Sequence, residues 1–163
     1  MDRFVSNVTT RLDAKGRVSI PASFRAVMAR DGFEGLYLRP ALDTPALDAG
    51  GNTLLNEIDL FLSTLSPCSD ERDRLATALF GTSEVLKIDS EGRVILSEPA
   101  KAHAGIADSV TFVGLGRKFQ LWEPERFRSH LESALTAVRR LRNGGKPLLV
   151  RAGQEHPPRA RDR

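Results

Sequence analysis

The chain has 163 residues, of which 40% are hydrophobic and 28% charged, and its formal net charge is +3 at pH 7. This composition is ordinary for a globular protein, and no stretch approaches the roughly 18 apolar residues of a membrane-spanning helix, so we expect no membrane partner. The single Cys68 cannot form an internal disulfide and no apolar leader follows Met1, which favours a cytoplasmic protein.

The charges are distributed unevenly along the chain. Residues 1–30 carry a net charge of +4 and residues 139–163 carry +6, which leaves −7 for the residues between them. Such an uneven distribution of charge indicates that particular surfaces of the protein contact a polyanion. For the C-terminal cluster, an equally good interpretation is that the basic residues only solvate a helix and a tail.

The first half of the chain predicts a strand–turn–strand unit followed by a helix. Its first residues have high β-propensity, and Pro21 suits the first turn of a helix. In chain order we predict a strand at 4–12, a turn at 13–16, a strand at 17–20, a helix at 21–30, a strand at 35–39 and a loop at 40–52. The first two strands and their turn should form a hairpin with a bulge.

The second half predicts the same plan after two connecting helices, which Pro67 separates. In chain order we predict helices at 53–65 and 69–81, a strand at 84–88, a turn at 89–92, a strand at 93–96, a helix from Pro99 to 105, strands at 109–114 and 118–122, and a helix at 124–142. Phe119 and Trp122 are expected in the core. The apolar stripe of the last helix is expected to pack against a neighbouring subunit or its own barrel, and the remaining residues predict a disordered tail.

A pentapeptide recurs in the two halves: DAKGR at residues 13–17 returns as DSEGR at residues 89–93, which is 76 residues later. Both copies lie between apolar, β-branched flanks. Identity at aspartate, glycine and arginine with matching flanks is improbable by chance, so two copies of one small unit are indicated. Each copy of about 75 residues would bury little surface alone, and the two should therefore share a core.

The motif has the chemistry of a tight turn, because aspartate offers a side-chain acceptor and glycine adopts positive φ. The residues assigned a structural role in the two motifs are Asp13, Gly16, Asp89, Gly92 and Arg93. The arginine allows two interpretations. It could pair with the aspartate and lock the turn, or it could project from a rigid loop and bind phosphate or a guanine edge.

The centres of the two turns differ in charge, with Lys15 in the first and Glu91 in the second. A phosphate would be attracted to the first turn and repelled by the second, so only the first is expected to be a main DNA contact. We expect Arg17 to read bases and Lys15 and Arg11 to bind phosphate. The further DNA-binding candidates are Arg3, on an N-terminal arm, and Arg25, on a helix flank.

The two halves together resemble the MraZ family of bacterial transcriptional regulators. The resemblance rests on LDAKGRVSIP at residues 12–21, IDSEGRV at 88–94 and FVGLGRKFQLW at 112–122, and it covers roughly residues 1–142. It implies an α+β fold in which two tandem AbrB/SpoVT-like repeats form a pseudo-twofold swapped-hairpin β-barrel with peripheral helices. The implied domains are a first SpoVT-AbrB repeat with its loop at 1–52, connecting helices at 53–81, a second repeat at 82–123, a C-terminal helix at 124–142 and a basic tail at 143–163.

The resemblance also implies ring-like homo-oligomers that bind double-stranded DNA at short tandem repeats in a promoter region. The implied role is that of a repressor of the gene cluster for cell division and cell-wall synthesis, associated with the nucleoid in the cytoplasm. A single basic loop neutralises only a few phosphates, so one protomer should bind weakly. Several protomers on consecutive DNA repeats would gain by avidity.

Two other classes of protein are conceivable for this sequence. An enzyme is not expected, because the three histidines are scattered and none of the common catalytic, phosphate-binding or metal-binding motifs occurs. We therefore predict no cofactor, no metal, no catalytic residue and no small-molecule substrate. The alternative function is an oligomeric protein-binding scaffold with the same fold and no DNA readout, and the basic loop around Lys15 and Arg17 argues against it.

Overall fold

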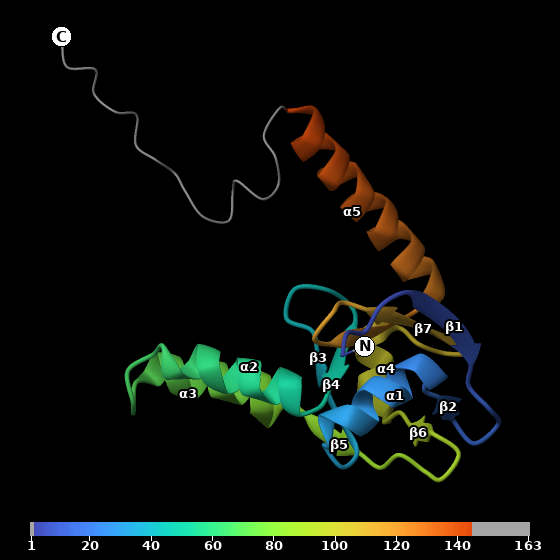
Figure 1. Ribbon diagram of the computed structural model, residues 1–163, viewed down its shortest axis with the longest axis horizontal. Coiled ribbons are helices and arrows are strands. Elements are labelled where there is room, and N and C mark those ends of the chain that lie inside the picture. Colours follow the sequence, from blue (N-terminus) through green and yellow to red (C-terminus); the bar gives the residue numbers. More distant parts are fainter. Residues whose placement is uncertain (1, 145–163) are drawn as a thin grey trace. The chain divides into compact units, whose positions relative to one another are not determined.

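The computed structural model describes residues 2–144, and the chain divides into two compact units with the boundary after Arg126. The first unit contains all the described strands and the helices α1 to α4, and the second contains most of helix α5, Pro124–Asn143 (Figure 1). The protein is thus a mixed α+β chain, as its sequence predicts.

The strands of the first unit are short, and most of them agree with the predicted positions. They are β1 Asn7–Arg11, β2 Arg17–Ser19, β3 Leu36–Pro40, β4 Leu47–Gly50, β5 Glu84–Leu86, β6 Arg93–Ile95, β7 Ser109–Gly114 and β8 Phe119–Trp122. The prediction of a loop throughout 40–52 is wrong, because β4 lies within it. All four residues of β4 are buried between β3 and β8, and tertiary pairing there overrides the low β-propensity of Asp48 and Gly50.

The helices of the first unit also agree with the sequence pattern. They are α1 Ala22–Asp31, α2 Asn52–Ser63, α3 Asp70–Ala76, which continues as the π-helical turn η1 Thr77–Gly81, and α4 Glu98–Ala104. The Ser69 side chain caps α3 by accepting a hydrogen bond from the Arg72 amide. In α4 the N-cap is Ser97, which lies 76 residues after Pro21, the N-cap of α1, so the two helices start in register and Pro99 lies in the first turn.

Six strands form one antiparallel sheet in the order β1-β7-β8-β4-β3-β5. Strands β1 and β5 are its two edges, so the sheet is open and the predicted barrel is not confirmed. Strands β2 and β6 form a separate two-stranded sheet. If β1 is exchanged with β5, β7 with β3 and β8 with β4, the strand order is the same when it is read from the opposite edge of the sheet.

The prediction of a local hairpin at residues 4–20 is wrong. Strand β1 pairs with β7, where Thr9 and Thr111 share a 2.8 Å hydrogen bond between their hydroxyl groups, and β2 pairs with β6. The turn between β1 and β2 therefore joins strands whose partners lie in the other half of the chain. An isolated hairpin is marginally stable, and pairing across the halves buries Val18 and Val94 against the common core.

Two clusters of buried residues hold the first unit together. The larger one contains four aromatic rings, Phe4, Phe24, Phe112 and Phe119, and the ring centroids of Phe4 and Phe119 are 4.8 Å apart. Phe119 and Trp122 are both buried, as predicted. The smaller cluster lies between β3 and the α2–α3 pair and contains Tyr37, Leu54, Ile58, Leu62 and Leu79.

The second unit consists, within the described residues, of the main part of α5. Leu131, Leu135 and Val138 repeat at helical spacing and are 38%, 44% and 47% exposed. No helix within residues 2–144 is long and apolar enough to cross a membrane. The predicted basic tail at 143–163 lies outside the described residues, apart from its first two positions.

Candidate nucleic-acid interface

The first turn is organised by the carboxylate of Asp13. Its Oδ1 accepts hydrogen bonds from the backbone amides of Lys15 and Arg17, both at 2.9 Å, and its Oδ2 accepts one from Arg17 Nε at 2.7 Å. Gly16, with φ of +78°, donates its amide to the Asp13 carbonyl at 3.0 Å. Asp13 therefore fixes both the turn and the direction of the Arg17 guanidinium, whose side chain stays 28% exposed.

The second turn has the same internal hydrogen bonds. Asp89 Oδ1 accepts from the amides of Glu91 and Arg93 at 2.9 Å, and Asp89 Oδ2 accepts from Arg93 Nε at 2.9 Å. Gly92 also has φ of +78° and donates to the Asp89 carbonyl at 3.0 Å. The two turns thus share one frame, and in both of them the arginine pairs with its own aspartate.

These hydrogen bonds change the acidity of both aspartates. The amide hydrogen bond from Arg17 holds the pKa of the Asp13 carboxyl below its usual value, and the Arg17 side chain acts in the same direction. The amide of Arg93 lowers the pKa of Asp89 likewise, and the hydrogen bond to Asp89 raises the pKa of Arg93. Both turns therefore carry an ionised aspartate at neutral pH.

The surroundings of the two turns differ. In the second turn, Arg93 Nη2 is also 3.1 Å from Glu91 Oε2, which binds the outer edge of the guanidinium. In the first turn the equivalent residue is Lys15, and within residues 2–144 the Arg17 side chain pairs with Asp13. Within the part of the chain that the structure describes, the first turn therefore presents a lysine without an ion-pair partner beside a guanidinium whose outer edge is free.

Arg25 of α1 lies across the second turn. Its Nε donates a 3.1 Å hydrogen bond to the Ile20 carbonyl, and a Cβ added to Gly92 would clash with its side chain. Beyond Gly16 itself and its two chain neighbours, no atom of the described residues would lie within 4 Å of a Cβ added to Gly16. Lys101, 76 residues after Arg25, instead pairs with Glu98 at 2.8 Å. The second turn is therefore covered and the first is open.

The β2–β6 pair brings the two turns onto one ribbon. Val18 lies opposite Val94 and both are buried, so the alternating positions Arg17, Ser19, Arg93 and Ile95 face outward. Ser19 lies opposite Arg93, and the Ile20 amide donates to the Gly92 carbonyl at 2.9 Å. The two motif arginines therefore share one outward face, an arrangement that is not predicted from the sequence. The valine that follows each arginine was the available signal.

The remaining candidates lie at different places. Arg11 ends β1 and is exposed, and Lys15 is exposed at the tip of the first turn. Arg3 is exposed beside Gly116, where the Phe4–Gly116 bridge ties the N-terminal segment to the β7–β8 turn. The structure thus places Arg11 at the end of β1, Lys15 in the turn that follows and Arg17 at the start of β2, and it separates Arg3 and Arg25 from them.

Known proteins match this chain over almost all of its length. A family model described as "MraZ protein, putative antitoxin-like" matches residues 79–139. A protein of Beijerinckia indica subsp. indica named transcriptional regulator MraZ is 62% identical over 164 residues, which is 99% of this chain and 100% of that one. Proteins with the same name from Methylocella silvestris and Rickettsia bellii are 65% and 39% identical, covering 87% and 82% of this chain and 87% of each relative.

A mixed α+β chain with two arginine-bearing turns on one ribbon, matched to these relatives, falls in the class of transcriptional regulators. Within that class, the chain belongs to the MraZ family.

Proposed function

We propose that the protein is a sequence-specific DNA-binding repressor that binds short tandem repeats in a promoter region, upstream of the gene cluster for cell division and cell-wall synthesis. It acts in the cytoplasm as a nucleoid-associated, ring-like homo-oligomer. Arg17 reads a base edge, Lys15 and Arg11 bind phosphates, and Arg3 is an outer contact. Arg25, whose exposed side chain covers Gly92, is a further outer contact.

The observation that carries this proposal is the open first turn. A guanidinium held by Asp13 at a fixed angle loses little conformational entropy when it binds, and its outer edge can donate two parallel hydrogen bonds to guanine. Arg11, at the end of β1, and Lys15, in the turn that follows, are close in the sequence and add charge for neighbouring phosphates. The acidic Glu91 of the second turn favours a structural role for Arg93.

We also propose that the fold consists of two tandem AbrB/SpoVT-like repeats with the domain bounds given above and a pseudo-twofold axis through the β4–β8 pair. Support comes from the strand order, which is unchanged when the halves are exchanged, and from the matching hydrogen bonds of the two turns. Such repeats exchange their first strands, as β1 and β5 do here.

Ring assembly follows from the small number of charges on each protomer. The two phosphate-binding side chains, Lys15 and Arg11, neutralise about two phosphates, which corresponds to a log–log salt slope of about −2 for one protomer. A ring places several such turns on consecutive repeats, about one helical turn of 10–10.5 bp apart, and the combined affinity then rises by avidity.

The test compares Arg17→Ala with Arg93→Ala on a duplex carrying the upstream region, at two salt concentrations. We expect Arg17→Ala to abolish binding while the protein stays folded, and Arg93→Ala to lower stability or assembly. Arg17→Lys keeps the positive charge and loses the planar guanidinium that can donate two parallel hydrogen bonds. This variant should retain phosphate binding but discriminate poorly between DNA sequences. Equal loss of binding in Arg17→Ala and Arg93→Ala, with equal stability, would refute the assignment of the two turns.

One observation favours the second candidate, an oligomeric protein-binding scaffold. Leu42, Phe61 and Leu115 are between 50% and 58% exposed, which is more apolar exposure than DNA binding requires. Wild-type protein that assembles but shows no salt-dependent DNA binding would favour the scaffold function instead.

A further inference from the structure

We propose that helix α5 of one copy of the chain docks in the groove beside α2 and η1 of a second copy, and that this contact builds the oligomer. The inference rests on the homo-oligomer of the proposed function and names the two surfaces that meet. Four observations support it: an apolar cavity, an excess of positive charge at its floor, an exposed helical stripe, and opposite net charges on the two partners.

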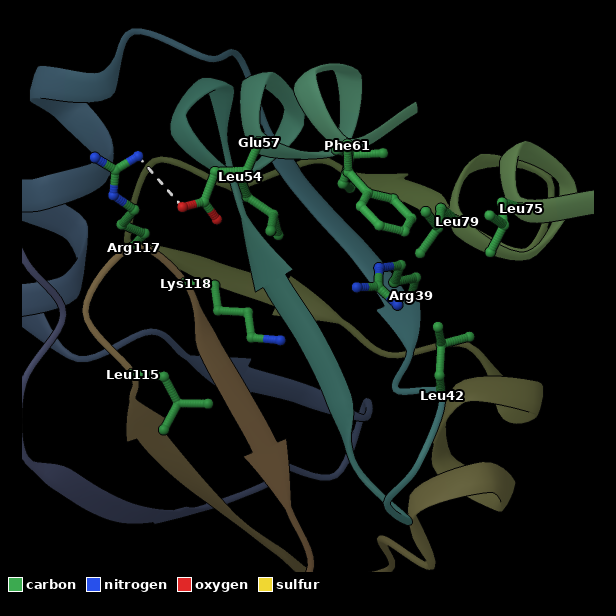
Figure 2. A pocket seen from close by; sticks show the side chains of 11 residues that line it. Arg39, Leu42, Leu54, Glu57, Phe61, Leu75, Leu79, Leu115, Arg117 and Lys118 are labelled. Atoms are coloured by element: carbon green, nitrogen blue, oxygen red, sulfur yellow. Dashed lines mark hydrogen bonds and ion pairs between the residues drawn. The ribbon is translucent and has the colours of Figure 1, made fainter. Parts of the chain in front are cut away.

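The groove is a cavity of about 420 Å³ in the first unit. Figure 2 shows that Leu54 and Phe61 of α2 and Leu79 of η1 line one side, while Leu42 and Leu115 lie across from them. Leu42, Phe61 and Leu115 are 58%, 51% and 50% exposed. Apolar side chains that converge on a cavity and remain this exposed indicate a surface that another protein covers.

The floor of the groove carries more positive than negative charge. Asp48 is 2% exposed, and its two oxygens bind Arg39 Nη2 at 2.9 Å and Lys118 Nζ at 3.1 Å, so one carboxylate serves two cations. Arg39 is 7% exposed, and its Nε and Nη1 have no hydrogen-bond partner within residues 2–144. The second cation, Lys118, is 30% exposed, and this excess of positive charge beside buried guanidinium N–H groups favours an incoming carboxylate.

Helix α5 has the features that such a groove accommodates. Leu131, Leu135 and Val138 lie at i, i+4 and i+7 on one face, which is the spacing of helices that bind apolar grooves. Glu132 directly follows Leu131 and brings a carboxylate to the edge of this stripe. The helix has 20 residues, a length of about 30 Å, which is enough to fill a groove and contact its rim.

The charges of the two partners are opposite. Residues 52–81, which include α2, α3 and η1, carry five acidic and two basic side chains, a net charge of −3. Helix α5 carries two acidic and five basic side chains, a net charge of +3. Opposite potentials accelerate encounter and fix orientation, while the apolar stripe supplies the buried contact.

A contact between a helix on one copy and a groove on the next is heterologous, because each copy uses two different surfaces. Repetition of such a contact closes into a ring when the rotation between successive copies allows it. This interface therefore provides a physical basis for the ring that tandem DNA sites require.

The test uses two assembly variants of the full chain. Leu131→Asp/Leu135→Asp alters the stripe and keeps the groove, and Leu42→Asp/Leu115→Asp alters the groove and keeps the stripe. Molar mass is measured by light scattering coupled to size-exclusion chromatography. We expect each variant alone to be monomeric and their equimolar mixture to give a dimer and nothing larger, because the mixture offers one intact pair of surfaces per two chains.

Two matched controls use the same type of substitution outside the proposed contact. Leu60→Asp changes a residue of α2 that is 68% exposed and does not line the cavity, and Ser133→Asp changes the opposite side of α5. Both should keep the mass of the wild type. Circular dichroism and thermal unfolding show whether each variant is folded.

Three results would overturn the inference. They are a monomeric wild type, assembly variants that keep the wild-type mass, or a mixture of the two folded variants that stays monomeric. A lower melting temperature of Leu131→Asp/Leu135→Asp without a change in mass would mean that the stripe covers its own chain. DNA binding is measured separately with Arg17→Ala, so assembly without DNA binding would refute the proposed function and leave this interface in place.

Discussion

The turns at 13–17 and 89–93 have the same hydrogen-bonded frame and different surroundings. Both use an aspartate to accept two amides and one guanidinium, and both use a glycine at φ of +78°. Arg25 and Glu91 cover the second turn, whereas the first stays open around Lys15. The comparison teaches that a repeated motif specifies a shape, and that residues outside its shared positions decide which copy can meet a ligand.

Among the exchanges between the two turns, DNA affinity should change most when the first turn is made to resemble the second. Lys15→Glu places a carboxylate where Glu91 lies in the second turn and should both repel phosphate and bind the free edge of Arg17. We expect DNA affinity to fall on the order of 100-fold, with a salt slope that is less steep by about 1 per protomer. Fluorescence anisotropy of a labelled duplex at several salt concentrations measures both quantities. Unchanged affinity with Lys15→Glu would show that DNA does not approach this turn.

The next effect concerns stability and separates the two glycines. Gly16→Ala should cost about 1 kcal/mol, because alanine is strained at positive φ. Gly92→Ala should cost about 2 kcal/mol, because the new Cβ also displaces the Arg25 side chain. Urea unfolding measures both values. In the background of Arg25→Ala the difference between the two glycines should disappear, and a difference that persists would show that Arg25 does not cover Gly92.

The pH dependence of stability should be the same for both turns. Each aspartate has its pKa lowered in the folded protein, so its contribution is present above the unfolded pKa of about 3.9 and is lost as pH falls through the folded value. Asp13→Asn and Asp89→Asn should each reduce the fall in melting temperature between pH 5 and pH 2.5. Thermal unfolding across this range measures it. A clearly larger effect at one aspartate would mean that the two frames differ energetically.

The smallest effect comes from making the second turn resemble the first. Glu91→Lys releases the outer edge of Arg93 and adds a positive charge to the outward face of the β2–β6 ribbon. We expect DNA affinity to rise by a few fold, because the added charge attracts phosphate. The gain should stay small, because the Arg25 side chain still covers Gly92 and limits the access of DNA to the second turn. The same anisotropy assay measures it, with Glu84→Lys as a control on strand β5. A gain of equal size in the control would indicate only a general charge effect.

The sequence predicts the turns well because their chemistry is local. Aspartate and glycine at fixed spacing specify the turn, and apolar periodicity locates α1, α2 and α5. Strand partners are not local, so the hairpin expected between β1 and β2 was wrong. Strand β4 was missed because its residues Leu47–Gly50 gain their conformation from neighbours on both sides.

The candidate site was predicted in part for the same reason. The charge difference between Lys15 and Glu91 can be read directly from the sequence. The position of Arg25 over Gly92 cannot, since it depends on how α1 packs against the other half of the chain. The shared outward face of Arg17 and Arg93 likewise depends on the pairing of β2 with β6.

The exchange of strands between the halves has a consequence for biosynthesis. Thr9 can form its hydrogen bond with Thr111 only after Thr111 has emerged from the ribosome, more than 100 residues later. Strand β1 therefore has no partner strand during most of translation. Pairing over such a sequence separation is slow, and a nascent edge strand is prone to aggregate. We therefore expect a fragment that ends at residue 81 to remain largely unstructured by circular dichroism, and folding of the intact chain to begin only after β7 is complete.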